Sequence, residues 1–448
     1  MLPSTLKYSG KIESAPAKSY RVNLAAQNGT GPYNPGEMIY INIPTQNNLC
    51  LCPAESYLKF RVNLTNNSGV ICNYARWDAA GAHGIIQRIR VFHQSNLCSD
   101  IDNYSQLAKI LMDSQMSTDS TYGKFSILAG TRNDLVSNSS TFSCLQVKSG
   151  RRFNGITPIP IGGTVNDTYC LNLISLVGTL CTEKYIPLWA LTSSSLRVEI
   201  QLVSSASKCI VSDQVLAMTV DNVEYIANMI EISDQAVEII KSSLNGQPLQ
   251  FTIGDYKNYQ TSFNVPAGNS QTTIPIAAKF SSLKALFVTQ QDSSKPGTLT
   301  YFPLSSNVFN LSSYYFRIGP NVVPIKAPET LVEMYAESVK AIGSMSSLLH
   351  QPSIEIDSYT ANLPVACNDG AGTNGLNGSG CFVIGLDTEN YINSNKETIF
   401  AGLNTNTVDT YFNPSYTGLA AATVITYNTF AHFDSVLVFD NNTMHIKF

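Results

Sequence analysis

Apolar and polar residues alternate along much of this chain. The clearest example is Ser195–Val203, where Leu196 and Val198 fall on one side of an extended strand and Arg197 and Glu199 on the other. Such alternation is typical of antiparallel strands that bury one face and expose the other. It recurs at Met38–Pro44, Tyr57–Leu64 and Ile85–His93. The pattern predicts an all-β protein.

Three segments instead have the apolar spacing of amphipathic helices, and they are Asn103–Asp113, Ser233–Gly246 and Pro328–Gly343. Asp102 or Asn103 is expected to cap the first helix, and Ser233 opens the second. In the third, Pro328 is expected in the first turn and Gly343 at the end. The residues expected to be buried are Leu107, Ile110 and Leu111 in the first helix, Val237, Ile240 and Leu244 in the second, and Leu331, Tyr335, Val339 and Ile342 in the third.

The same order of elements occurs twice. In the first half a strand at Gly84–Gln94 leads to the first helix, and in the second half strands at Phe280–Gln290 and Tyr314–Gly319 lead to the third. The second helix falls between the two sets, and Gln247–Tyr256 begins the second set of strands. A boundary near residue 245 divides the 448 residues almost evenly. Two all-β domains of about 200 to 250 residues each fit this length.

Long connections separate some of the strands, and they are rich in glycine, serine, asparagine and threonine. They cover Ser114–Gly155, Gln291–Asn310 and Cys367–Gly380. This composition predicts exposed loops, and their length suggests that they contact a neighbour or form an outer tower. A loop with no role is the alternative for each of them.

The chain closes with the pattern of a β-hairpin. Val436–Phe439 is a short apolar run, Asp440–Thr443 has the composition of a turn, and Met444 and Ile446 then alternate with polar residues. A last strand of this kind must pair with a strand from much earlier in the chain. The run at Val436–Phe439 is expected to be covered on both faces.

Few residues are charged. Aspartate, glutamate, lysine and arginine make up 13% of the chain, against about 25% in an average soluble domain. The net charge of −4 gives no general attraction to nucleic acid, so sequence-specific nucleic-acid binding is not expected. The start is mildly basic, with Lys7, Lys11, Lys18 and Arg21 against Glu13, and a solvated arm is a more frequent role for such a stretch than a DNA or membrane contact. We expect this arm to become ordered on assembly.

The sequence shows no secretory signal, no membrane-spanning run and no closely spaced cysteine pair of the C-x-x-C type. The first 20 residues lack the apolar core of a secretory signal, and no apolar run reaches the roughly 18 residues of a membrane-spanning helix. We therefore expect a soluble chain that is made in the cytosol and not secreted. The 10 cysteines include no C-x-x-C pair that could begin a zinc or redox site, so free and mostly buried thiols are expected.

We find no arrangement of residues that predicts catalysis. The five histidines are far apart in the sequence, and His93 and His432 lie in strand patterns where a structural role is expected. His432 and Asp434 share a strand face, but a serine is never far away in this chain, so a triad drawn from them carries no weight. Asp387 and Glu389 share a face as a glycosidase pair would, although solvated acids at a strand end are the favoured reading. No catalytic, cofactor-binding or metal-binding residue is predicted, and Arg317 is expected to face a neighbouring loop or subunit.

Three segments together resemble a known family. They are Ala82–Leu111, Tyr314–Gly343 and Phe382–Phe448, which contain in this order I-D-N-Y before a helix, R-I-G before a proline and a helix, I-G-L-D, G-L-N-T and a terminal F-D-x-x-L hairpin. This order resembles double jelly-roll major capsid proteins, those of polinton-like viruses and virophages of eukaryotes above all. The matching segments cover about a third of the chain and lie in both halves.

The resemblance implies two tandem jelly-roll β-sandwiches with a few short helices. Its expected parts are an N-terminal arm at 1–20, a first roll at 21–232, a connecting helix at 233–246 and a second roll at 247–448, which the hairpin at Phe433–Phe448 would close. It further implies a structural, non-enzymatic capsid subunit in the virion. Homotrimers would form pseudo-hexameric blocks that tile an icosahedral shell around a DNA genome, with penton and minor capsid proteins as further partners and an internal membrane left open.

Two other classes share some of these features. A secreted or surface β-sandwich that binds glycans would have similar strands and polar loops, but a signal peptide and disulfides would be expected of it. A β-sandwich hydrolase would need a focused set of acid, base or metal ligands. The glycan-binding protein is the stronger of these two alternatives.

Overall fold

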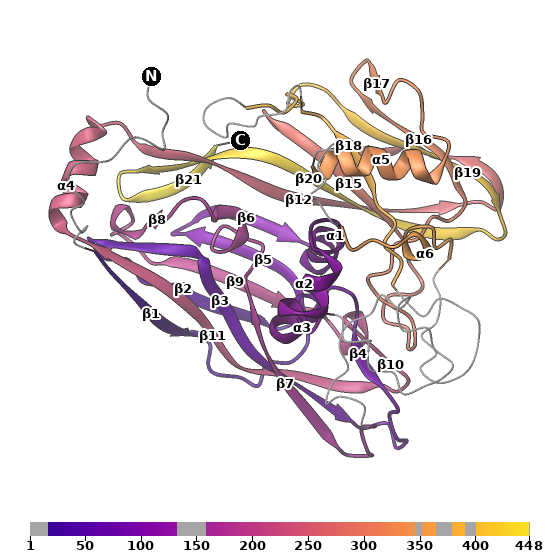
Figure 1. Cartoon of the computed structure of the whole chain (residues 1–448), viewed down its shortest axis with the longest axis horizontal. Coiled ribbons are helices and arrows are strands. Elements are labelled where there is room, and N and C mark those ends of the chain that lie inside the picture. The colour runs from indigo at the N-terminus through magenta and orange to yellow at the C-terminus, as the bar shows by residue number, and fades with distance from the viewer. Residues whose placement is uncertain are drawn as a thin grey trace, which may run out of the picture.

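The computed structural model describes residues 17–131, 158–343, 345, 352–363, 379–389 and 400–447. Within these residues the strands form four large antiparallel sheets and one two-stranded sheet (Figure 1). Helix α4 (Asp234–Ser243) separates the chain into two halves, and each sheet takes all its strands from one half. The expectation of an all-β fold is confirmed.

Two large sheets face each other in the first half. One has the order β1-β11-β3-β7, with β8 beside β3, and its bounds are β1 Ala17–Ala25, β11 Leu216–Ile232, β3 Leu49–Asn66, β7 Thr164–Leu171 and β8 Ile186–Pro187. The other has the order β2-β9-β5-β6, with bounds β2 Met38–Ile43, β9 Leu196–Leu202, β5 Ile86–His93 and β6 Asn96–Asp102. The two-stranded sheet pairs β4 (Ala75–Trp77) with β10 (Ile210–Ser212).

The second half repeats this arrangement. One sheet has the order β12-β20-β15-β18, with β21 beside β20, and its bounds are β12 Leu249–Val265, β20 Thr423–Asp440, β15 Leu283–Asp292, β18 Ile384–Asp387 and β21 Thr443–Lys447. The other has the order β13-β19-β16-β17, with β14 beside β19, and its bounds are β13 Gly268–Gln271, β19 Thr410–Leu419, β16 Leu311–Ile318, β17 Asn321–Val323 and β14 Ile274–Ile276.

The two halves share one strand order. If the eight principal strands of each half are counted along the chain, one sheet of each half reads first, eighth, third and sixth, and the other reads second, seventh, fourth and fifth. Helices α1 (Tyr104–Gln115) and α5 (Leu331–Ile342) both lie between the fifth and sixth strands. The repeat expected from the sequence is therefore present. The exact residue limits of the two units stay a prediction, and β1 begins at Ala17, within the range expected for the arm.

The three predicted helices exist; α1 ends two residues later than predicted, α4 and α5 are shorter, and the predicted caps are only partly correct. Asn103 occupies the cap position of α1, but its side chain makes no capping bond there. Ser233 caps α4 as expected, because its hydroxyl accepts a hydrogen bond from the backbone of the first turn. α5 is capped by Thr330, which forms a capping box with Glu333. The placement of Pro328 in the first turn is therefore wrong.

The buried face of α5 also differs from the expected stripe. Met334 and Ser338 are its buried residues, whereas the four predicted apolar residues are only partly buried. Ser338 accepts a hydrogen bond at 2.9 Å from the backbone of Gly385 on β18, and its hydroxyl lies 2.9 Å from the carbonyl of Val383. These hydrogen bonds, and the absence of a side chain on Gly385, place the Met334 and Ser338 face of α5 against the sheet.

The long connections hold more structure than their composition predicts. Short helices α2 (Thr118–Tyr122) and α3 (Lys124–Ala129) follow α1, while 132–155 lies outside the described residues. The connection before β16 is exposed only in its first part, at Ser293, Ser294, Gly297 and Thr298, whereas its residues from Phe302 to Phe309 are all buried. The apolar side chains in this stretch pack into the protein, which corrects the prediction. Of Cys367–Gly380, only the last two residues are described, and both are buried.

The C-terminal hairpin is confirmed, but among the described strands its last strand, β21, pairs with β20, so the expectation that the last strand pairs with one from much earlier in the chain is wrong. β20 pairs with β12 along its whole length, with β15 on its other side, and then with β21. Asn441 and Asn442 have φ of 50° and 60°, which is the left-handed pair of a two-residue hairpin turn. Leu437, Val438 and Phe439 are buried, so this strand is covered on both faces.

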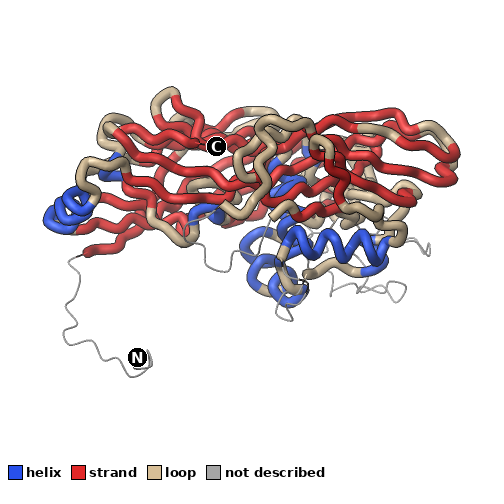
Figure 2. The backbone as a smooth tube through the Cα atoms, turned by 90° about the horizontal axis from the view of Figure 1, so that it is seen from above, coloured by secondary structure: helices blue, strands red, loops and turns tan. Residues whose placement is uncertain are grey.

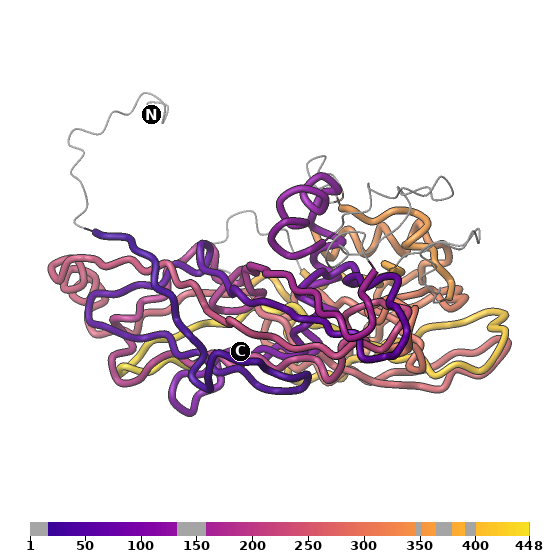
Figure 3. The backbone as a smooth tube through the Cα atoms, turned by 90° about the horizontal axis from the view of Figure 1, so that it is seen from below, coloured from indigo at the N-terminus to yellow at the C-terminus, as the bar shows by residue number. Residues whose placement is uncertain are grey.

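Buried apolar side chains form one continuous cluster through both halves. Figure 3 shows the halves side by side along the long axis, with the purple helical segment of the first half beside the orange one of the second. Most helices gather on one side of the strands, while α4 stands alone at one end (Figure 2). Helix α6 (Ile356–Tyr359) and short 3₁₀ turns complete the described secondary structure.

Candidate functional site: the interface between the two halves

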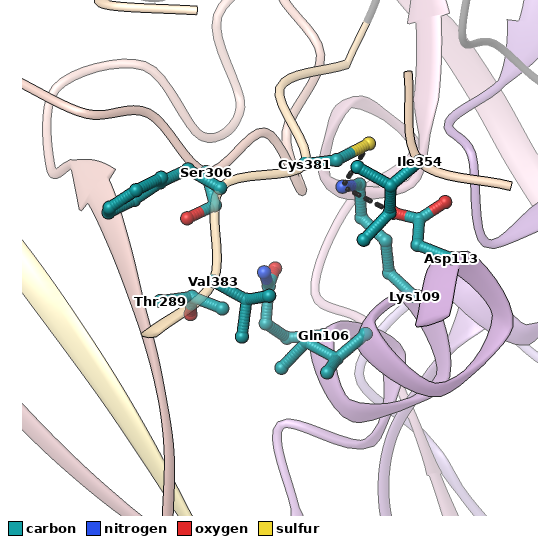
Figure 4. A pocket seen from close by; sticks show the side chains of 10 residues that line it. Gln106, Lys109, Asp113, Thr289, Ser306, Ile354, Cys381 and Val383 are labelled. Atoms are coloured by element: carbon teal, nitrogen blue, oxygen red, sulfur yellow. Dashed lines mark hydrogen bonds and ion pairs between the residues drawn. The ribbon is translucent and has the colours of Figure 1, made fainter. Parts of the chain in front are cut away.

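Polar side chains gather where the two halves meet, and Lys109 of α1 is a buried cation among them. Its side chain is 2% exposed. Its Nζ lies 3.0 Å from a carboxylate oxygen of Asp113, 2.7 Å from the carbonyl of Gly380 and 3.6 Å from Sγ of Cys381 (Figure 4). An ammonium group has three hydrogens, so these partners satisfy all of them. Two of the partners belong to the second half.

A second buried carboxylate, Asp78, adds to this cluster. It accepts a hydrogen bond of 2.7 Å from the backbone of Leu304 in the second half. Burial raises the pKa of Asp78, and the charge of Lys109 acts in the opposite sense. Burial alone would lower the pKa of Lys109, but the groups around it, Asp113 first, raise it above its usual value. Lys109 and Asp113 therefore form a buried ion pair, while burial disfavours the charged form of Asp78 beside them.

Five amide side chains form a directed chain across the interface. Gln87 of β5 donates to Asn103 at 2.8 Å, and Asn103 donates to Asn428 of β20 at 2.9 Å. Asn428 donates to Gln291 of β15 at 3.2 Å, and Gln291 donates back to Gln106 of α1 at 3.0 Å. The chain thus leaves the first half, crosses the second and returns. Hydrogen bonds linked in this way reinforce one another in a buried environment.

A small polar hollow lies beside this chain. Gln106, Lys109, Thr289 and Ser306 are among the residues that line it, and Figure 4 shows them converging from both halves. It has room for about one water molecule, which is far below the several hundred Å³ typical of a small-molecule site. The small size of this hollow, and its lining from both halves, fit a contact that joins the halves better than a substrate-binding site.

The C-terminal hairpin makes a separate set of cross-links. The backbone N–H of Met444 in β21 donates to Nδ1 of His93 in β5 at 3.1 Å. The carbonyl of Met444 accepts from Asn96 at 3.2 Å, and the carbonyl of Asn442 accepts from Ser193 at 2.6 Å. Met444 itself is fully buried. The end of the second half is therefore bound to two strands and a loop of the first.

A further link joins β6 to β12. The hydroxyl of Ser99 donates to the carboxyl of Asp255 at 3.3 Å, and the backbone of Tyr256 donates to the same oxygen at 2.8 Å. Asp255 is buried, and burial raises its pKa to about 7, with the nearby charge of Asp100 acting in the same sense. A carboxyl group that titrates near neutrality therefore lies between the halves.

Comparison with known proteins bears on the fold. No protein-family model matches the sequence, and no curated protein matches it. A chain in the cryo-EM structure of the Sputnik virophage aligns with a TM-score of 0.62 and 11% identity, over 100% of this chain and 91% of that one. The mavirus major capsid protein aligns with a TM-score of 0.56 and 12% identity, over 100% and 93%. The Faustovirus major capsid protein aligns with a TM-score of 0.57 and 8% identity, over 97% and 92%.

Both halves of this chain have the strand order of two interlocked Greek keys, and the matches extend over the whole length of the chain. The fold is a double jelly roll. The first jelly roll supplies Lys109, Asp78 and His93 to the interface, and the second supplies Asp255 and the C-terminal hairpin. The resemblance seen in the sequence is confirmed at the level of the fold.

Among the described residues around His432 and Asp434, serine, histidine and acid do not contact one another in the order that a triad needs. The hydroxyl of Ser282 donates to Asp434 at 2.8 Å, so the serine contacts the acid and not the histidine. The ring of His432 stacks on Tyr256 with centroids 4.6 Å apart, and burial lowers the pKa of His432 to about 3. Such a histidine is held neutral and has a structural role, as expected.

The other sequence candidates also lie in local contacts. The carboxylate of Asp387 accepts from the backbone of Glu389 at 2.9 Å, and Glu389 pairs with Lys284 at 3.2 Å. The guanidinium of Arg317 lies 5.5 Å from the ring centre of Tyr411, a contact within its own chain. Whether Arg317 also faces another subunit stays a prediction.

The described cysteines, possible metal ligands and helices were compared with the sequence predictions in the same way. The cysteines in the described part of the chain are free, and all except Cys170 are buried. Burial raises the pKa of Cys50 to about 11, so its thiol is unreactive near neutral pH. In the described ranges no three or more His, Cys, Asp or Glu side chains come together as metal ligands would. No described helix is long and apolar enough to span a bilayer.

The polar interface residues were not identified from the sequence. Only the apolar stripe of α1 was used, whereas Gln106, Lys109 and Asp113 follow one another at spacings of three and four residues. That spacing places them on one side of the helix, beside the apolar stripe. The sequence signal that could have indicated a buried polar contact is this second, polar stripe at helical spacing beside the apolar stripe.

Proposed function

We propose that this chain is a major capsid protein, a structural and non-enzymatic subunit of a viral shell. The observation that carries the proposal is the repeated jelly roll with one rigid interface between the copies. The Faustovirus and mavirus proteins that align with it are both major capsid proteins, and they align over more than nine tenths of either chain.

The proposed assembly is a homotrimer. Three chains with two rolls each would give a pseudo-hexameric block, and contacts between blocks would tile an icosahedral shell around a DNA genome. Penton and minor capsid proteins are the further proposed partners, and the proposed location is the virion, after synthesis in the host cytosol. The low charge of the chain suits close packing of identical copies, because repeated like charges would repel.

The proposed domain limits follow the same plan. They are an arm at 1–20, a first roll at 21–232, a connecting helix at 233–246 and a second roll at 247–448. Strand pairing that stays within each half supports this division. The long interface between the rolls lets the two act as one block.

Light scattering behind a sizing column tests the proposal. A trimer has three times the 48.7 kDa of one chain, and electron microscopy of the concentrated sample should then show sheets or shells. A strict monomer at all concentrations that forms no ordered arrays contradicts the proposal. In that case binding of the same sample to a glycan array would favour the alternative of a glycan-binding sandwich.

A further inference from the structure

The cross-link between His93 and the C-terminal hairpin depends on one protonation state. Nδ1 of His93 accepts the backbone N–H of Met444, so Nδ1 carries no proton. The other ring nitrogen, Nε2, lies 3.3 Å from the carbonyl of Ser194. A neutral imidazole has one donor and one acceptor, and here Nε2 donates to Ser194 while Nδ1 accepts from Met444. Both nitrogens are therefore in use.

Protonation of His93 is incompatible with this arrangement. A proton on Nδ1 would point at the N–H of Met444, so a hydrogen bond would become a contact between two donors. The ring is fully buried, so the new charge would also be cut off from water. The Met444 N–H would in turn lose its partner in a buried position, which is costly for a backbone group.

Charges near His93 do not offset this cost. The charged, histidine and cysteine side chains on the strands packed against it are Cys98, Asp100 and Asp102 on β6, Arg197 and Glu199 on β9, His432, Asp434 and Asp440 on β20, and His445 and Lys447 on β21. Burial raises the pKa of the Cys98 thiol to about 12, so Cys98 stays neutral. Arg197 pairs with Glu199 at 3.1 Å, and Asp100 pairs with Arg88 at 2.6 Å. The pKa of His93 is lowered by burial, with the Ser194 carbonyl acting in the opposite sense, and none of these charges contributes.

We propose that His93 is an acid-sensitive latch, whose protonation releases the C-terminal hairpin of the second jelly roll from the first. The other contacts of the hairpin come from Asn96, Ser193 and the Cys98 thiol, and none of them titrates in acid. Asp255 also titrates between the halves, but its raised pKa means that a fall in pH favours the folded interface there, so release in acid is assigned to His93. In a shell, the released strand β21 would become available to a neighbouring molecule. The latch itself belongs to the single chain and does not rest on the proposed function.

The sign of the pH dependence follows from the lowered pKa. The latch is intact above the ordinary histidine value of 6.5 and is lost as the pH falls through the lower value of the folded protein. The other two buried histidines, His83 and His432, have pKa values lowered to about 4 and about 3 by burial. They stay neutral until the solution is more acidic, which separates release of the hairpin from general acid unfolding.

Amide hydrogen exchange of the full-length chain tests the latch. Protection of the Met444 amide, relative to the unfolded-chain rate at each pH, is followed from about pH 7 down to the pH at which the amides of β11 lose their protection. We expect it to fall about tenfold per pH unit once the pH is below the pKa of His93, while amides of β11 stay protected. In His93→Asn the side-chain oxygen replaces Nδ1 as acceptor but cannot be protonated in this range, so protection should become independent of pH.

His445→Asn is the matched control, since His445 lies next to Met444 but is partly exposed, and it should behave as the wild type. Constant protection of the wild-type Met444 amide would overturn the proposal, and so would an equal loss in His93→Asn. A simultaneous loss of protection at β11 would also overturn it, because it would show global unfolding. If His93→Asn does not fold, the wild type and His445→Asn still decide between these outcomes. None of these results depends on whether the chain forms trimers.

Discussion

Asp255 offers the sharpest test of the interface energetics. Burial raises its pKa from 3.8 to about 7, so the folded protein resists the charged form. One pKa unit corresponds to about 1.36 kcal/mol, and this shift therefore corresponds to about 4 kcal/mol. Because a raised acid pKa stabilises the protein only while the group is protonated, this stability is complete below about pH 4 and is lost as the pH rises through about 7.

The perturbation is Asp255→Asn, which keeps the shape and an oxygen acceptor for Ser99 and the Tyr256 backbone but removes the charge. We expect the variant and the wild type to unfold at similar urea concentrations near pH 4. At about pH 8 the variant should be more stable by up to about 4 kcal/mol. Urea titrations followed by circular dichroism, repeated across this pH range, measure the difference directly.

Asp440→Asn is the control, because Asp440 is exposed in the turn of the hairpin. It should follow the wild type at every pH. A stability difference between Asp255→Asn and the wild type that stays constant from pH 4 to pH 8 would refute the reasoning. A variant that becomes less stable than the wild type as the pH rises would refute the reasoning equally, because the folded protein would then favour the charged form of Asp255.

Two further substitutions test the packing between the rolls and against α5. Lys109→Met removes the cation of the buried ion pair with Asp113 and should lower the free energy of unfolding by about 3 to 5 kcal/mol. Lys340→Met, in a largely exposed pair on α5, should change it by less than about 1 kcal/mol. Equal effects of the two substitutions in urea denaturation would contradict the argument. In Gly385→Ala the new Cβ would lie 2.6 Å from a backbone atom of α5, so the melting temperature should fall, with a cost of about 1 to 3 kcal/mol. Gly343→Ala, with nothing within 4 Å, should melt as the wild type does.

The fold was predictable because it depends on local patterns. Alternation such as that at Leu196 and Val198 is written into neighbouring residues, and it matches β9 closely. The turn at Asn441 and Asn442 could be predicted in the same way, since asparagine tolerates positive φ. Strand order was available only through the resemblance, because no local pattern states which strands become neighbours.

The interface was not predictable for a physical reason. Asn103 reads as a helix cap by its position, yet its side chain bonds to Asn428, more than 300 residues later. The stretch around Phe302 reads as a loop by composition, but it is buried because the first roll lies against it. Both errors arise where a partner distant in sequence competes with the local preference and wins.

The amide chain between the rolls has a head and a tail, and this makes its members unequal. Gln87 and Gln106 stand at the ends and take part in one bond each of the chain, whereas Asn428 in the middle donates one and accepts another. A mutation at either end shortens the chain, but a mutation in the middle cuts it in two and leaves both fragments without a neighbour. We therefore expect substitution of Asn428 to disturb more of the chain than substitution of Gln87.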